Sequence, residues 1–356
     1  MKCEIRPFDE ETLSDAKKVV SEMYTEKTCA LLDKMLANPL RKELTLSSVG
    51  DVVYQDDNPV AFQGAIPRRL YIGQKPITSI VGSTLCSRPD TSPVLLMKLM
   101  RKTIAPRSNS EIFFANTANN ASYKMNRLLG VNGACPSTYY SWRFAVLKWH
   151  SFVAYLIRRK IFKRPIHWQE VAYDKYASFE MHRSSIWFQR EMAFDGETYD
   201  RFFSEYLIHN KGVVSSRYSY ELEYMFGNRL RSGACVLISA REGDKIIGYI
   251  VIESENKSWT RWQIIDLIAL ENDGKILKML INAAKSFLRR TPAVLLVSIG
   301  FSPHFHNVFS STLPFSRKLY GNFFLYKVYD KSDFTDKLIE SADSWFFGPY
   351  DGDMCL

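Results

Sequence analysis

The spacing of apolar residues along the chain predicts alternating strands and helices. In the first half, the longest strand-like segment runs from Ile77 to Ser87. The pattern breaks at Arg88-Pro89-Asp90, and apolar positions then return at helical spacing from Val94 to Ile104. Ser92 suits a helix N-cap and Pro93 suits the first helical position. We therefore expect a long strand that leads through a polar turn into a capped helix.

The rest of the first half shows the same kinds of pattern. Apolar residues at helical spacing predict a helix from Glu11 to about Tyr24, and another from about Asn120 to Leu129 that Gly130 ends. Shorter runs, several bounded by turn residues, predict the strands Cys3–Pro7, Asp51–Gln55, Val60–Pro67, Arg68–Ile72 and Glu111–Asn116.

The second half repeats this order loosely. A helical region is expected over Ser184–His209, followed by three strands, a polar turn, an amphipathic helix and a further strand. The shared order predicts an α/β fold of two tandem domains, each a mixed, mostly antiparallel sheet flanked by helices. The second-half strands and helix are expected at Ala234–Arg241, Lys245–Glu253, Arg261–Leu270, Ile276–Leu288 and Ala293–Ile299.

Charge is concentrated in one part of the chain. The net charge is +9, and the interval 112–169 holds nine Lys and Arg residues with no Asp or Glu. Such a region suits an anionic partner, which could be a phosphate-bearing coenzyme, an anionic membrane surface or RNA; a solvated basic surface around a linker is the alternative. Within it, residues 144–164 are first apolar and then basic. We expect a domain at 1–143, a connector with one amphipathic helix at 144–183, and a second domain at 184–356.

Cysteine spacing and hydropathy bear on the compartment. The six cysteines are scattered without short paired spacings, which favours free thiols over a disulfide framework or a metal site. The sequence shows neither a secretory signal nor an apolar run long enough to span a bilayer. We expect a cytoplasmic protein without a metal cofactor.

The expected strand, turn and capped helix form a device that can hold phosphate. The first N–H groups of a helix have no internal partner and lie at the positive end of its dipole, and a strand edge can pair with the amides of an extended ligand. The candidate binding residues are Leu85, Cys86 and Ser87 at the strand end, then Thr91, Ser92, Val94 and Leu95.

These segments resemble the GCN5-related N-acetyltransferases, the GNAT superfamily. Strand segments at 60–69 and 81–85, the Arg88-Pro89-Asp90 turn and the helix from Asn119 to Gly130 stand where that family has its coenzyme-binding core. Residues 220–224, 248–249 and 345–347 resemble the second domain of a tandem bacterial subgroup associated with surface-polysaccharide genes. The resemblance implies tandem GNAT-like domains, acetyl-CoA or another acyl-CoA as co-substrate, and a coenzyme contact at Asn119.

The segments that carry catalysis depart from the family pattern. The family's coenzyme loop carries glycines that this chain lacks, and Asn126 stands where many members have a tyrosine that protonates the leaving thiolate. Tyr123, three residues earlier, is a candidate general acid, with a packed aromatic as the alternative. Asp266 lies in an apolar strand and is a candidate base, with a structural ion pair as the alternative.

The resemblance implies an acyl-CoA-dependent N-acyltransferase whose acceptor is an amine, such as an amino sugar or another surface-glycan precursor. Two other hypotheses stay open. One is a catalytically silent binding or scaffold protein, suggested by the missing glycines and tyrosine. The other is an aminoacyl-tRNA-dependent transferase, suggested by the basic region, which also suits peripheral contact between residues 124–164 and an inner membrane or RNA.

Overall fold

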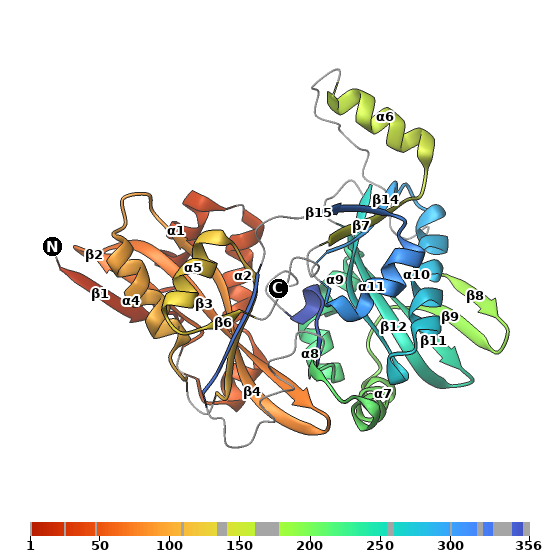
Figure 1. Ribbon diagram of the computed structural model, residues 1–356, viewed down its shortest axis with the longest axis horizontal. Helices are drawn as coiled ribbons and strands as arrows, with labels where there is room; N and C mark the ends of the chain where they lie inside the picture. The colour runs from red at the N-terminus through yellow and green to blue at the C-terminus, as the bar shows by residue number, and fades with distance from the viewer. Residues whose placement is uncertain are drawn as a thin grey trace.

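The chain builds two mixed β-sheets, each flanked by helices, as the sequence predicts (Figure 1). The computed structural model describes residues 2–24, 26–46, 48–107, 110–133, 141–160, 178–254, 260–299, 301–318, 323–329 and 344–351. Cys135, Cys355 and residues 161–177 of the predicted connector lie outside these ranges.

The first sheet has nine described strands in the order β1-β2-β3-β4-β5-β16-β6, with β10 also paired to β3 and β17 to β10. Most neighbours are antiparallel, but β4 and β5 are parallel, as are β10 and β17. The predicted strands Val60–Pro67 and Arg68–Ile72 form one continuous strand. The bounds are β1 (Cys3–Pro7), β2 (Gly50–Gln55), β3 (Asn58–Ile72), β4 (Lys75–Ser87), β5 (Ile112–Ala118), β6 (Asn132–Gly133), β10 (Val213–Ser215), β16 (Phe323–Val328) and β17 (Trp345–Phe346).

The helices of the first half are α1 (Leu13–Met23), α2 (Glu26–Leu36), α3 (Pro39–Glu43), α4 (Pro93–Ile104) and α5 (Asn120–Leu128). The predicted start of α4 is confirmed: Pro93 occupies its first turn, and Ser92 Oγ accepts a hydrogen bond from Val94 N at 3.3 Å. Sequence reasoning missed α2 and α3, although Leu31, Leu32 and Met35 in α2 have helical spacing and are buried.

The second sheet has the order β15-β7-β14-β13-β12-β11-β9-β8. Here β13 and β14 are the parallel pair. The bounds are β7 (Ser141–Val146), β8 (Glu180–Arg183), β9 (Ile186–Glu191), β11 (Cys235–Glu242), β12 (Lys245–Ser254), β13 (Arg261–Ala269), β14 (Leu295–Ser298) and β15 (Phe315–Lys318).

The helices of the second half are α6 (Trp149–Lys160), α7 (Gly196–His209), α8 (Ser219–Leu222), α9 (Asn228–Arg231), α10 (Gly274–Arg289) and α11 (His306–Thr312), with a π-helical turn at Glu223–Gly227 and 3-10 turns at Leu270–Asn272, Pro303–Phe305 and Pro349–Asp351. The predicted helical region Ser184–His209 is partly wrong, because its first part is strand β9. Phe188 and Arg190 are buried at alternate positions of β9, and Ser184 turns the preceding hairpin with a φ of 55°.

The two sheets exchange strands across the middle of the sequence. Strand β7, from the first half, pairs with β14 in the second sheet, whereas β16, from the second half, pairs with β5 in the first. Strand β10 also crosses to pair with β3. Membership of a sheet therefore does not follow order along the chain, and the domain boundaries at 143 and 183 stay a prediction.

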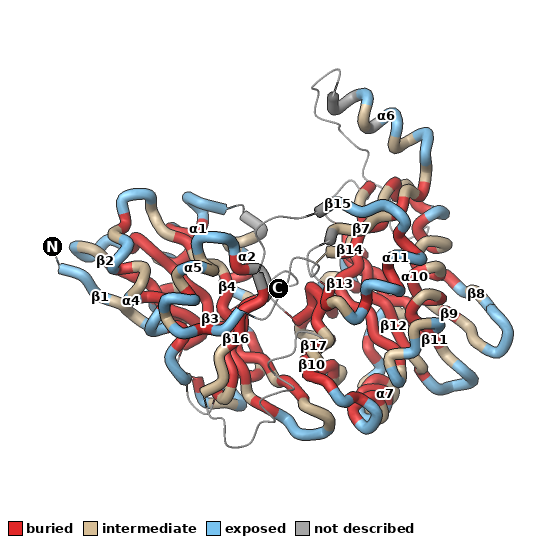
Figure 2. The backbone as a smooth tube through the Cα atoms, viewed as in Figure 1, coloured by how far each residue is buried: buried red, intermediate tan, exposed pale blue. Residues whose placement is uncertain are grey.

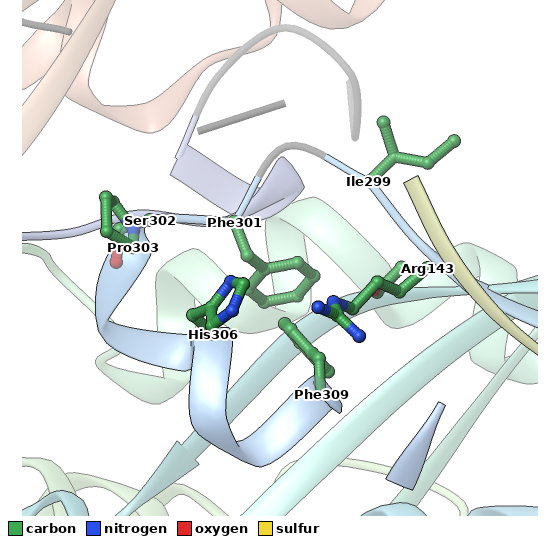
Figure 3. Close-up of a pocket in the computed structure, with 8 residues that line it drawn as sticks. Arg143, Ile299, Phe301, Ser302, Pro303, His306 and Phe309 are labelled. Carbon is green, nitrogen blue, oxygen red and sulfur yellow. The ribbon is translucent and has the colours of Figure 1, made fainter. Parts of the chain in front are cut away.

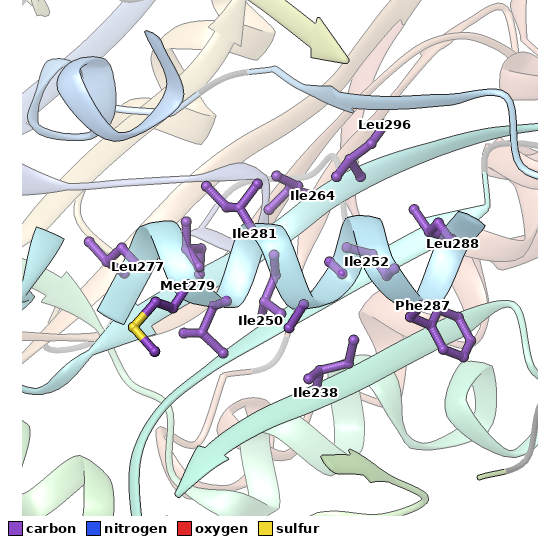
Figure 4. Close-up of a cluster of buried hydrophobic side chains, with 14 of the residues drawn as sticks. Ile238, Ile250, Ile252, Ile264, Leu277, Met279, Ile281, Phe287, Leu288 and Leu296 are labelled. Carbon is purple, nitrogen blue, oxygen red and sulfur yellow. The ribbon is translucent and has the colours of Figure 1, made fainter. Parts of the chain in front are cut away.

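The strands of both sheets consist largely of buried residues (Figure 2), and most of these are apolar. The largest cluster lies where α10 crosses the second sheet (Figure 4). There Leu277, Ile281 and Leu288 of α10 pack with the strand residues Ile250 and Leu296. None of the helices in the described ranges combines the length and hydrophobicity of a membrane span.

Candidate active site

A cleft opens in the first sheet where two parallel neighbours separate. Strand β4 pairs with β5 only from Ser79 to Val81, although both strands continue beyond these positions. The opening has a volume of about 610 Å³, which is within the usual range of small-molecule sites. We call it the first cleft. Its lining is Met23, Tyr24, Thr28, Leu31, Gln63, Gly82–Ser87, Leu96, Phe113, Ala115, Ala118, Asn119, Ala121, Ser122, Met125 and Asn126.

Small residues keep the base of the first cleft open. Ala115 and Ala118 of β5 line it, and Gly82 of β4 faces the ring of Phe113. A Cβ atom at Gly82 would lie 2.6 Å from that ring, so a side chain there would displace it. Local sequence gave no signal for this arrangement, because Gly82 and Phe113 meet only through sheet pairing.

Strand β4 is irregular where it borders the first cleft. The register with β3 shifts between Phe62 and Gly64, and Thr84 has a φ of 46°. A bulge of this kind leaves an extra residue unpaired in the ladder and turns backbone groups away from the neighbouring strand. The carbonyl oxygen of Leu85 already accepts a hydrogen bond from the Tyr24 hydroxyl at 3.3 Å. The strand end thus presents hydrogen-bonding groups to the cleft.

Two amide side chains in the cleft wall have unmatched acceptors. Gln63 and Asn126 are each 4% exposed, and neither Gln63 Oε1 nor Asn126 Oδ1 has a hydrogen-bond partner within the described chain. Asn126 Nδ2 donates to Ser122 O at 2.7 Å, which fixes its orientation. A buried acceptor without a donor costs about 1–3 kcal/mol, so such groups are usually kept for a ligand, water or a structural change.

Four of the predicted binding residues line the first cleft: Leu85, Cys86, Ser87 and Asn119. Asn119 is also the N-cap of α5, where its side chain accepts from Ser122 N at 2.9 Å. Burial raises the pKa of the Cys86 thiol to about 12, so this side chain stays protonated at neutral pH.

The other four predicted binding residues lie at the start of α4 and are not in the cleft lining. Thr91 is buried and donates to Val60 O at 3.1 Å, and Leu95 is buried in the core. The amide of Leu95 donates to Ser92 O at 3.0 Å, and that of Val94 donates to Ser92 Oγ. Both amides predicted to hold phosphate therefore already have an internal acceptor.

Neither predicted catalytic residue lines the first cleft. Tyr123 is on α5, but its ring packs beside Gly133 with other apolar side chains under β16. Asp266 lies in β13 of the second sheet and is 1% exposed. It accepts from Arg217 at 2.9 Å and from the Tyr249 hydroxyl at 2.8 Å. Tyr123 is thus packed against apolar side chains and Asp266 is paired with Arg217, and their catalytic roles stay predictions. Sequence reasoning did not select Gln63, although a single amide in the apolar run Val60–Pro67 was a usable signal.

The second sheet holds a much smaller pocket near its own parallel pair. Strand β13 pairs in parallel with β14 as far as Ile264 and Ser298, and a pocket of only about 20 Å³ lies at the end of β14 on the side of β7. We call it the second cleft. Its lining is Arg143, Ser298, Ile299, Phe301, Ser302, Pro303, His306 and Phe309, and Figure 3 shows Phe301 lying between Arg143 and His306.

Comparison with solved structures shows which known proteins share this fold. No family model matches the sequence, and no curated protein sequence matches it. The chain is similar to a GCN5-related N-acetyltransferase from Kribbella flavida, with a TM-score of 0.55, 12% identity and coverage of 92% of this chain and 72% of that one. It is also similar to a GCN5-related N-acetyltransferase from Anabaena variabilis, with a TM-score of 0.56, 10% identity and coverage of 92% of this chain and 73% of that one.

A further similar structure is Saccharomyces cerevisiae N-myristoyltransferase with bound myristoyl-CoA. Its TM-score is 0.53, with 15% identity over 97% of this chain and 84% of that one. At such identities the similarity shows the fold alone. The chain has the α/β fold of the GCN5-related N-acetyltransferases, as its sequence motifs predict.

Proposed function

We propose that the chain is an acyl-CoA-dependent N-acyltransferase that works at the first cleft. The observation that carries the proposal is the opening of about 610 Å³ where β4 and β5 separate beside a bulged strand end. Similarity to solved N-acyltransferase structures supports the reaction class. A long, narrow co-substrate suits this site because an exposed strand end can bind the amides of an extended chain.

The reaction that suits the first cleft is direct transfer. The amine nitrogen attacks the thioester carbonyl carbon, a C–N bond forms, the C–S bond breaks, the amine loses a proton and the thiolate gains one. Backbone groups at Leu85–Ser87 would orient the pantetheine arm and polarise the thioester carbonyl. Gln63 Oε1 would accept a hydrogen bond from an N–H group of the pantetheine arm or of the attacking amine. Cys86 takes no part as a nucleophile, because its raised pKa keeps the thiol protonated.

For the acceptor, we propose an amino sugar or another amine precursor of a surface glycan. Sequence motifs in the second half support this choice, since residues 220–224 and 345–347 resemble the tandem subgroup found with polysaccharide genes. A panel of amino sugars and alkylamines incubated with acetyl-CoA, followed by mass spectrometry of the products, tests it. Acetylation of alkylamines but not of amino sugars contradicts the glycan assignment.

A second candidate is a binding protein with this fold and no turnover. The observation that favours it is the internal pairing of the Val94 and Leu95 amides, which leaves α4 fewer free donors for a pyrophosphate. An aminoacyl-tRNA-dependent transfer is supported only by the basic interval 112–169.

Calorimetric titration with acetyl-CoA separates these functions. The purified chain should bind acetyl-CoA, and Ala121→Trp should weaken binding at least about tenfold, because Ala121 is exposed in the cleft wall at the start of α5. Lys124→Trp is the matched control, since Lys124 is an exposed residue of α5 that is not in the lining. If neither acetyl-CoA nor CoA binds the unmodified chain, the acyltransferase proposal fails and the binding-protein function is favoured.

A further inference from the structure

Helix α6 (Trp149–Lys160) projects from the edge of the second sheet (Figure 1). The start of α6 is anchored to the sheet. Leu147 N, two residues before the helix, donates to Val294 O at 2.8 Å, and the Trp149 ring meets Phe315 edge-on with 5.7 Å between the ring centroids. Beyond this anchor the helix extends away from the body of the protein and is drawn in the colours of exposed and intermediate residues (Figure 2).

One face of α6 is apolar and open to water. Trp149, Val153 and Ile157 are 57%, 48% and 43% exposed, and their spacing of four residues places them in one stripe. Phe152 and Leu156 are half-buried and also four residues apart, so they form a second row next to that stripe. Single exposed apolar residues are common on protein surfaces, but a continuous stripe on a projecting helix marks an interaction surface.

The charges of α6 all have the same sign. The helix contains no Asp or Glu, and its last turn is Arg158-Arg159-Lys160. Acidic residues are absent from the whole interval 112–169. A partner must therefore accept large apolar side chains and attract cations along the same short helix.

We propose that α6 docks on an anionic lipid surface, with the Trp149–Val153–Ile157 stripe in the headgroup region. An amphipathic helix with a basic terminus binds such a surface through buried apolar area and attraction to anionic lipids, and tryptophan suits the boundary between headgroup and acyl chain. Nucleic acid would attract the cations but would leave Val153 and Ile157 without a partner. The proposal is independent of chemistry at the first cleft.

Flotation with lipid vesicles tests the proposal. The full chain should float with vesicles of phosphatidylcholine and phosphatidylglycerol, should not float with phosphatidylcholine alone, and should dissociate at high salt. Val153→Glu with Ile157→Glu should abolish flotation. Ile208→Glu is the matched control and should float normally, because Ile208 is 62% exposed on another helix, α7.

A second variant tests the charges without touching the apolar stripe. Arg158→Glu with Arg159→Glu and Lys160→Glu should lower vesicle binding on the order of a hundredfold or more, because each basic residue near an anionic surface contributes about 1 kcal/mol. Far-UV circular dichroism and acetyl-CoA titration show whether each variant is folded. Equal binding to uncharged vesicles, binding to RNA alone, or self-association through the stripe without vesicle binding would each overturn the proposal.

Discussion

The two sheets contain the same motif, a pair of parallel strands, and the pockets beside the two pairs differ greatly in volume. In the first sheet, Gly82, Ala115 and Ala118 border an opening of about 610 Å³ between the separating strands. In the second, the pocket at the end of β14 has a volume of about 20 Å³, and Phe301 in its lining lies 4.9 Å from Phe309 and 5.2 Å from Phe305 between ring centroids. A parallel strand pair does not by itself make a site, because the side chains around it decide how much space remains.

Buried polar groups contrast more sharply between the first cleft and strand β13 than between the two clefts. The first cleft has Gln63 and Asn126 with unmatched acceptors, and the second cleft has Arg143 Nε and Ser302 Oγ without a partner in the described chain, whereas β13 carries Asp266 in a closed network outside both clefts. Arg217 donates to Asp266 and, at 3.3 Å, to Asp351, and Asp351 Oδ2 accepts from Gly348 N at 2.6 Å. Burial raises the pKa of Asp351, and the charge of Arg217 opposes that shift. The paired groups around Asp266 suit a structural role, whereas the unmatched amides of the larger cleft are available to a ligand.

The largest expected effect is on the closed network. Arg217→Met should lower the free energy of unfolding by about 4 kcal/mol, because it leaves Asp266 and Asp351 buried without a cation. Urea denaturation measures this change. Arg201→Ala is the control and should cost under about 0.5 kcal/mol, since its pair with Glu197 is exposed. A small effect of Arg217→Met would mean that the network is not structural.

Opening the second cleft should cost stability without creating a site. Phe301→Ala should lower the free energy of unfolding by about 3 kcal/mol, because the side chain is 7% exposed among other aromatic rings. Calorimetry should still find a single acetyl-CoA site. If the variant gains a second site, the two clefts differ only in the volume that aromatic side chains occupy.

Removing the unmatched acceptor of the first cleft should have opposite effects on stability and function. Gln63→Leu should raise the free energy of unfolding by about 1 kcal/mol while lowering acetyl-CoA affinity or the transfer rate. Denaturation and calorimetry on one preparation measure both. Gln74→Leu, at an exposed turn, should change neither. Lower stability with unchanged affinity would show that Gln63 is a structural residue.

The smallest expected effect concerns the rate at which a thiol reagent labels Cys86 in the first cleft. Iodoacetamide at neutral pH should modify exposed Cys3 well before Cys86, since burial holds the pKa of Cys86 near 12 and the thiolate is the reactive form. Mild alkaline conditions should not remove this difference, and peptide mass spectrometry measures it. Rapid labelling of Cys86 at neutral pH would reopen a covalent mechanism.

Local signals in the sequence predicted local structure well. The strand Ile77–Ser87, the N-cap at Ser92 and the helix that follows are confirmed, because capping and apolar spacing act within a few residues. Ile186–Glu191 was misassigned because a short apolar run fits either a strand or a helix, and its pairing with β11 decides.

The cleft itself depends on pairings that lie far apart in the sequence. Its width is set where β4 and β5 stop pairing, and β5 is completed by β16, which the sequence patterns did not predict. Leu85 could be placed in the site from its position at a strand end, and Asn119 from the resemblance to the GNAT superfamily. On helix α5, Asn126 lines the first cleft and Tyr123 does not. This difference depends on how α5 packs against the sheet, which local sequence does not reveal.

The exchange of β7 and β16 constrains how this protein can fold as it is synthesised. When residues 1–143 have left the ribosome, the first sheet still lacks the strand that completes it beside β5, because Phe323–Val328 has not been made. The residues that line the first cleft all lie before residue 127, but the strand that supports β5 from its other side is made only near the end of the chain. Early intermediates therefore expose an unpaired edge at β5, which favours aggregation or chaperone binding. A gene fragment ending near residue 143 should be a poor substitute for the intact protein.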